Sequence, residues 1–116
     1  MILDTYYMAL RELVATANAS KAVTKIGFGT GTEPERTTDT ALQNAYIRPL
    51  NGYELDATNP RLLRLSYRLL RHEASDLDIT EIGLYTEDET LVARKVRDRI
   101  KKTPDMEFGD TWELLV

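Results

Sequence analysis

Ile79-Thr80-Glu81-Ile82-Gly83-Leu84-Tyr85 is the clearest structural signal in the sequence. A polar segment, Thr86-Glu87-Asp88-Glu89-Thr90, follows it, and a second apolar run, Leu91-Val92-Ala93, comes next. Two apolar runs around a short polar turn are typical of a β-hairpin. We therefore expect a fold built mainly from antiparallel β-structure.

Two further segments have the two-residue period of a strand. In residues 21–29 the alternate positions are Ala22, Thr24, Ile26 and Phe28. At the C-terminus they are Met106, Phe108, Asp110, Trp112, Leu114 and Val116. Residues 29–40 contain almost nothing to bury, which predicts a long loop after the first of these strands.

The N-terminal segment has the period of a helix instead. Its apolar residues recur at spacings of three and four: Leu3, Tyr6, Tyr7, Leu10, Leu13, Val14 and Ala17. This pattern predicts an amphipathic helix whose apolar side packs on the sheet or on a neighbouring subunit, with Asp4 as the N-cap. A short second helix is expected near residue 40, through Leu42, with Thr38 or Asp39 as its cap.

Residues 61–73 fit two structures. In a strand, Leu63, Leu65, Tyr67 and Leu69 would line one face. In a helix, Asn59 would be the cap, Pro60 would take the first position and four arginines would form a stripe. The local pattern slightly favours the helix.

Composition and length define the class of protein. The chain has 116 residues, no cysteine and a net charge of −4. We expect one domain over residues 1–116, with the helix in 1–20 and a β-rich part in 21–116. The expected fold class is α+β, mainly β: an antiparallel sandwich or partly open barrel with an N-terminal helix. The sequence shows no secretory signal and no apolar run long enough to insert in a membrane.

Several segments resemble sites of known chemistry and lack an essential part. The segment that contains Gly27, Gly29 and Gly31 resembles a dinucleotide-binding fingerprint, but Thr32 stands where the fingerprint needs its third glycine. Backbone freedom at the exit of a strand is the simpler interpretation of these glycines. His72 is the only histidine and is expected in a solvated or edge position. The acids around Asp76 do not have the spacing of a calcium loop. We therefore expect no enzyme activity, cofactor or metal site.

Residues 94–102 form the one basic cluster. It lacks the aromatic side chains on which nucleic-acid bases stack, and the whole protein is acidic. A charged edge strand or a protein interface explains the cluster better than contact with nucleic acid.

The sequence resembles the N-terminal domain of bacteriophage tail-collar and tail-fibre proteins over residues 22–116. The similar segments are 24–31, 40–44, 79–85, 91–94 and 102–106 before Trp112, and the core Ile79–Leu84 is the most specific. The resemblance implies a structural piece of the virion tail without enzymatic activity, and a strand at residues 61–70. Its partners would be other phage tail proteins and copies of itself. Its location would be the virion tail, after assembly in the host cytoplasm.

Two departures from the family pattern refine this expectation. The chain stops after its last strand, where family members often continue into a fibre shaft, and the turn 86–90 lacks the usual glycine. The first departure favours a short standalone tail or baseplate component, such as one encoded by a prophage.

Self-association is expected through the helix and the basic cluster. The interface residues would be Tyr6, Tyr7, Leu10, Arg94, Lys95, Arg97 and Arg99. The basic residues would pair with Glu87, Asp88 and Glu89 of a neighbouring copy. The alternative function is a binding module for carbohydrate or another surface ligand that uses the loop 29–40, although this loop contains no aromatic side chain for stacking.

Overall fold

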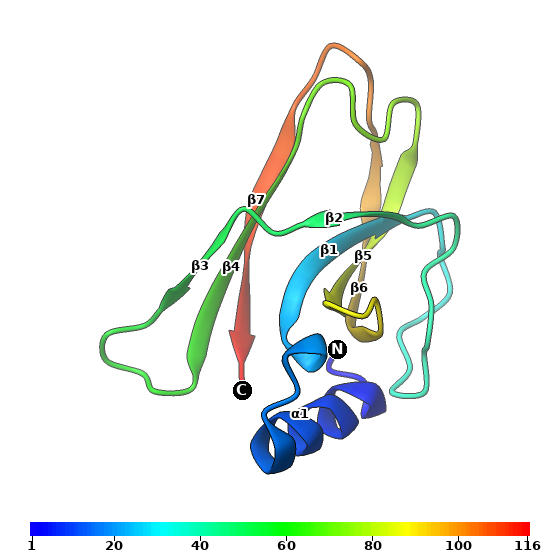
Figure 1. Cartoon of the computed structure of the whole chain (residues 1–116). Helices are drawn as coiled ribbons and strands as arrows, with labels where there is room; N and C mark the ends of the chain where they lie inside the picture. Colours follow the sequence, from blue (N-terminus) through cyan, green and yellow to red (C-terminus); the bar gives the residue numbers. More distant parts are fainter.

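The computed structural model describes residues 1–116 and contains one α-helix, one short 3₁₀ helix and seven strands in two antiparallel sheets (Figure 1). The elements are α1 (Asp4–Thr16), η1 (Ala19–Lys21), β1 (Val23–Gly29), β2 (Tyr46–Pro49), β3 (Gly52–Leu55), β4 (Leu62–Leu69), β5 (Asp78–Thr86), β6 (Leu91–Lys101) and β7 (Phe108–Leu115). The predicted fold class, mainly β and sandwich-like with an N-terminal helix, is confirmed.

The first sheet has the strand order β2-β1-β5-β6. Its centre is the predicted hairpin, in which β5 and β6 pair antiparallel with Gly83 opposite Arg94. The pairing shifts register between Ile79 and Glu81, so the long strand β6 bends along its length. Residues 94–101, which the sequence presents as a basic cluster, therefore continue the second strand of the hairpin, at an edge of the sheet.

The second sheet has the order β3-β4-β7. Residues 62–69 form the strand β4, as the family resemblance implied and against the local helical pattern. The strand is central in its sheet, with Leu65 opposite both Tyr53 and Trp112. The chain passes from the first sheet to the second between β2 and β3, where Leu50 still donates its N–H to the Thr24 carbonyl of β1. Neither β2 nor β3 was predicted.

The core lies between the sheets. Phe28 of β1 packs edge-on against Tyr67 of β4 and Phe108 of β7, with ring centroids 5.6 and 6.3 Å apart. Trp112 and Leu114 are buried on the inner face of β7, as the alternation at the C-terminus predicted. Burial raises the pKa of Tyr67 to about 12, and the charge of Asp110 adds to this effect while Arg97 opposes it.

Helix α1 lies across one end of the sandwich (Figure 1). Only Tyr6 and Ala9 of the helix are buried, whereas Tyr7, Leu10 and Val14 are exposed. The helix therefore covers its own domain with fewer residues than the apolar pattern indicated. Leu3 occupies the N-cap position and no side chain caps the helix, so the prediction of Asp4 as the cap was wrong.

The second predicted helix, near residue 40, was also wrong. Residues 37–38 and 43–44 are turns, and Asn44 has a φ of 50°. Leu42 is nevertheless buried, because it packs on the outer face of the first sheet with Leu3, Tyr85 and Leu91. The loop between β1 and β2 is fixed by contacts to the sheet instead of by helical hydrogen bonds.

Candidate functional site

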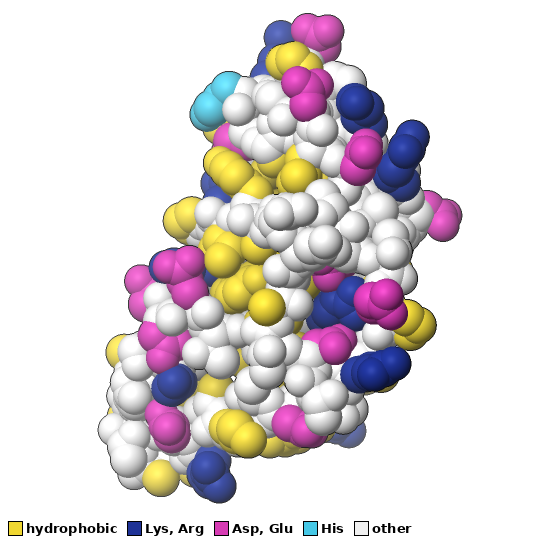
Figure 2. Space-filling model, turned by 90° about the vertical axis from the view of Figure 1, so that its right-hand side faces the viewer, with side chains coloured by type: hydrophobic (Ala, Val, Ile, Leu, Met, Phe, Trp, Pro, Cys, Tyr) yellow, Lys and Arg dark blue, Asp and Glu magenta, His cyan; other side chains and the backbone are white.

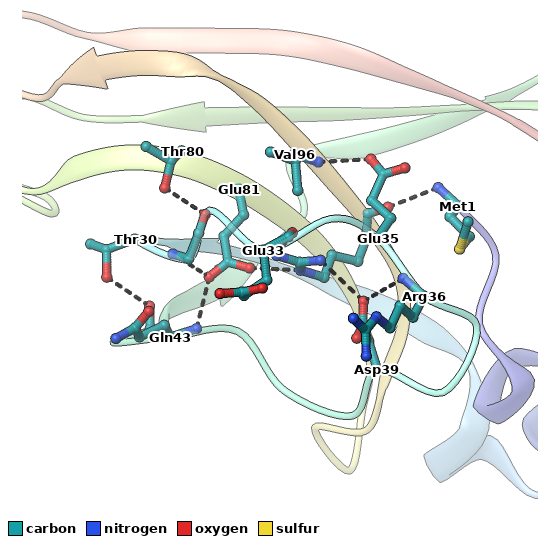
Figure 3. A network of polar contacts seen from close by, with 12 residues as sticks. Met1, Thr30, Glu33, Glu35, Arg36, Asp39, Gln43, Thr80, Glu81 and Val96 are labelled. Carbon is teal, nitrogen blue, oxygen red and sulfur yellow. Dashed lines mark hydrogen bonds and ion pairs between the residues drawn. The ribbon is translucent and has the colours of Figure 1, made fainter.

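Glu81 is the centre of a buried polar network on the outer face of the first sheet (Figure 3). Its side chain is 1% exposed. The Gly31 and Gln43 backbone N–H groups donate to its Oε2 atom at 2.7 and 2.8 Å, and Arg94 Nε donates to its Oε1 atom at 2.7 Å. These contacts compensate the carboxylate, which would otherwise be costly to bury.

Arg94 connects Glu81 to the loop between β1 and β2. Its Nη1 atom lies 3.0 Å from Asp39 Oδ2, and its Nη2 atom donates to the Glu33 carbonyl at 2.9 Å. Burial acts to lower the pKa of Arg94, but the hydrogen bond and charge of Glu81, together with Asp39, outweigh it and raise the pKa. The expectation that Arg94 contacts a neighbouring copy was wrong, because its side chain is 4% exposed and its partners lie within the domain.

Glycine is needed at positions 29 and 31 because of Glu81. A Cβ atom at Gly29 would lie 2.6 Å from Glu81 Oε2, and one at Gly31 would lie 2.4 Å from the same atom. No glycine of the protein has a positive φ. The interpretation of these glycines as sites of backbone freedom was therefore wrong, and what they supply is room for a carboxylate.

Further contacts hold the same loop and the N-terminus on the sheet. Thr80 Oγ1 donates to the Gly31 carbonyl at 2.7 Å, and the Val96 N–H donates to Glu35 Oε1 at 2.8 Å. The N-terminal amino group donates to the Arg94 carbonyl at 2.8 Å. The network thus connects β5, β6, the loop and the first residue, and its role in the domain is to stabilise their arrangement.

The remaining basic residues of the cluster 94–102 are dispersed. Lys95 lies over the ring of Trp112, 4.6 Å from its centroid, and Arg97 lies over Phe108 at 5.1 Å. Lys102 is buried, and its Nζ atom donates to the Arg71 and Thr103 carbonyls. Arg99 remains exposed at the edge of the sheet. On the face in Figure 2, basic and acidic side chains are interspersed and do not separate by sign.

The acidic turn that was expected to meet these cations has partners within the domain. Asp88 pairs with Lys21 at 2.7 Å, and Glu89 lies 3.6 Å from Lys25. Glu87 accepts a hydrogen bond from the hydroxyl of Thr24. These contacts anchor the turn to the start of β1.

His72 is exposed in the turn after β4, as predicted, and is the cyan side chain near one end of the molecule in Figure 2. No three His, Cys, Asp or Glu side chains are grouped so that they could hold a metal ion. No helix of the protein has the length and apolarity needed to cross a membrane.

An apolar surface lies between the start of β1 and the second sheet. A cavity of about 470 Å³ is lined by nine residues, seven of them hydrophobic: Ala22, Val23, Thr24, Leu50, Gly52, Tyr53, Leu55, Leu63 and Leu65. A second cavity of about 330 Å³ shares Ala22, Val23 and Leu63 with it and extends to Tyr6 and Leu10 of α1 and to Val116. We call the two together the apolar groove.

Of the predicted interface residues, Tyr6 and Leu10 line the apolar groove, and Tyr7 is exposed on α1. The four basic residues do not line it. Tyr53 and Leu55, which also line the groove, were not predicted as interface residues, and they are 74% and 71% exposed. The signal that identifies them is a short apolar–acid–apolar run, Tyr53-Glu54-Leu55, next to Gly52.

No family model matches the chain, and comparisons with curated proteins and with solved structures likewise found no match.

Proposed function

We propose that this protein is a structural component of a bacteriophage or prophage tail, and that it acts by assembling with other proteins. The observation that carries the assembly role is the apolar groove with its exposed rim. Exposed apolar surface rimmed by polar residues is typical of protein–protein contact sites. The tail itself is inferred from the resemblance of residues 22–116 to tail-collar and tail-fibre domains.

The ion pairs that the buried charged residues form within the domain support the same role. Glu81, Arg94 and Asp39 compensate one another inside the domain and stabilise the loop 30–45 on the first sheet. The Gly31 and Gln43 N–H groups, Glu35 and Asp39 of that loop are engaged with the sheet, and no specific observation favours carbohydrate binding there. A partner that covered the groove would bury its apolar side chains, and this burial is the main favourable contribution to the free energy of association.

Incorporation into particles tests this proposal. The chain is expressed with a short affinity tag in its native host, the prophage is induced, and particles are purified by density gradient and analysed by mass spectrometry. The tagged chain is expected in the tail fraction. Leu55→Asp, which places a charge in the groove at an exposed position, is expected to reduce incorporation without a change in thermal stability, whereas Arg99→Asp is the control. A chain that stays entirely outside the particles would contradict the tail assignment.

A further inference from the structure

The edge of β3 carries unpaired backbone groups beside the apolar groove. Strand β3 pairs only with β4, with Glu54 opposite Arg64, and the Asp56 N–H donates to the Leu62 carbonyl at 3.1 Å in the same register. Backbone hydrogen bonds of an antiparallel pair form at alternate residues. The N–H and C=O groups of Tyr53 and Leu55 therefore point away from β4, toward the open edge.

The side chains of the same two residues face the groove. Tyr53 is opposite Leu65 and Leu55 is opposite Leu63, and all four line the larger cavity. Ala22, which precedes β1, and Val23, the first residue of β1, also line this cavity. A strand added beside β3 would therefore place every second side chain in this apolar cavity.

The edges of β6 and β7 lack this combination. The edge of β6 begins under the N-terminus, where the Leu3 N–H donates to the Val92 carbonyl, and Glu35 accepts the Val96 N–H. The inward side chains of β7, Trp112 and Leu114, are buried. Proteins usually protect exposed strand edges with charges or coverage. At β3 the inward side chains are apolar and exposed, so this edge is suited to receive a strand.

Charge on the outer face of the second sheet defines the chemistry of the added strand. Glu113, Arg64 and Glu54 are directly opposite one another across β7, β4 and β3. Arg64 forms its close ion pair with Asp56, at 3.0 Å, and Glu54 makes no ion pair. The residue of an added strand opposite Glu54 would continue this row, and a cation there would be favourable. A second copy that paired its own β3 antiparallel in the centred register would instead place Glu54 opposite itself.

We propose that the edge of β3 binds an extended segment of another protein, in which two apolar residues flank a lysine or arginine. The apolar residues occupy the groove, the cation faces Glu54, and the backbone groups of Tyr53 and Leu55 pair with the segment. This inference rests on the proposed role of the groove in assembly and names the kind of partner that occupies it.

Titration with capped synthetic peptides tests the proposal on the full chain. The probe is a seven-residue peptide with a valine–lysine–valine centre and threonine flanks, and the comparison peptide has glutamate in place of lysine. In two-dimensional NMR the lysine peptide is expected to shift the amide signals of Tyr53 and Leu55 saturably. It is expected to bind about threefold to tenfold more tightly than the glutamate peptide, as opposite-charge and like-charge cross-strand pairs differ by this order.

Two variants and a modified peptide make the test specific. Glu54→Lys, at an exposed position, is expected to reverse the order of the two peptides, whereas Glu113→Lys on the far strand keeps it. A lysine peptide N-methylated on the amides that face β3 is expected not to bind. The proposal is overturned if the shifts are absent at millimolar peptide, if Glu54→Lys leaves the preference unchanged, or if β3 signals shift with protein concentration alone, which would identify a second copy as the occupant. None of these outcomes depends on particle incorporation, so a failure here is distinguishable from a failure of the tail assignment.

Discussion

Arg94 Nε lies 2.7 Å from Glu81 Oε1, between two neighbouring strands of the first sheet, with both side chains buried. Arg94 is opposite Gly83 in the hairpin, two residues along from Glu81, so the pair is diagonal. The pair also binds the loop 30–45, since Glu81 accepts two of its backbone N–H groups and Arg94 binds Asp39 and Glu33. Its loss should therefore affect both the stability of the domain and the position of the loop.

Arg94→Leu is expected to lower the free energy of unfolding by about 3–5 kcal/mol, because it leaves the Glu81 carboxylate buried without its cation. Urea denaturation measures the change. Arg99→Leu, on the same strand but exposed, is the control and should change it by less than about 0.5 kcal/mol. Adding Glu81→Gln to Arg94→Leu should cost less than the sum of the single changes, because position 81 then carries no buried charge that lacks its cation. If the changes in the free energy of unfolding of the two single variants summed to that of the double variant, Glu81 and Arg94 would not be energetically coupled.

Gly31→Ala is expected to destabilise the protein by about 1–3 kcal/mol, because its Cβ would overlap the buried Glu81 carboxylate. The matched control is Gly52→Ala, where the nearest atom to a new Cβ is Ser66 Oγ at 3.9 Å. At Gly52 an alanine fits without strain and reduces the entropy of the unfolded chain. Thermal unfolding of the two variants compares them directly, and equal melting temperatures would show that the space at Gly31 is not restricted.

Glu73 should make stability depend on pH in the acidic range. Burial acts to raise the pKa of Glu73, but hydrogen bonds from the Leu70 N–H and the Tyr46 hydroxyl, with the charge of Arg48, outweigh it and lower the pKa. A carboxyl whose pKa is lower in the folded state stabilises the fold fully above its unfolded pKa of about 4.3. This stabilisation is lost as the pH falls through the folded pKa.

Glu73→Gln is therefore expected to destabilise the protein at pH 7 and to reduce the loss of stability between pH 5 and pH 3, a range that brackets the unfolded pKa of about 4.3. Urea midpoints across this range give the comparison. Tyr46→Phe, which removes one hydrogen bond and keeps the carboxylate, should show an intermediate dependence. If the stability of Glu73→Gln depended on pH as strongly as that of the wild type, the Glu73 carboxyl would be excluded as the source of the acid dependence.

The exposed side of α1 is expected to support self-association at high protein concentration, since Tyr7 and Leu10 present apolar surface there. Sedimentation of wild type and of Tyr7→Ser with Leu10→Ser measures it, and the double variant should shift toward the monomer with an unchanged melting temperature. Tyr6→Ala is the contrasting variant, because Tyr6 packs in the core of its own domain and its loss should lower stability. A wild type that stays monomeric at high concentration and low salt would contradict self-association.

Elements with a long and regular pattern could be predicted from the sequence alone. The hairpin of β5 and β6, the alternation in β1 and β7 and the amphipathic helix α1 were all predicted, because burial on one side of an element imposes its period on the residues. The extent of burial was less predictable. In α1 the apolar pattern is broader than the surface that the sheets offer, so Tyr7 and Val14 remain exposed.

Features that depend on residues distant in the chain could not be predicted and follow from the packing of the folded protein. Residues 62–69 have a pattern compatible with helix or strand, and pairing with both β3 and β7 makes them a strand. Gly31 and Glu81 are 50 positions apart, so the sequence could not show that the glycine makes room for the carboxylate. The strands β2 and β3 have four residues each, too few for a period to be recognised. The larger cavity of the apolar groove lies between the start of β1 and the strands β3 and β4, which belong to different sheets. The relative placement of two sheets is a property of their packing, which no local pattern encodes.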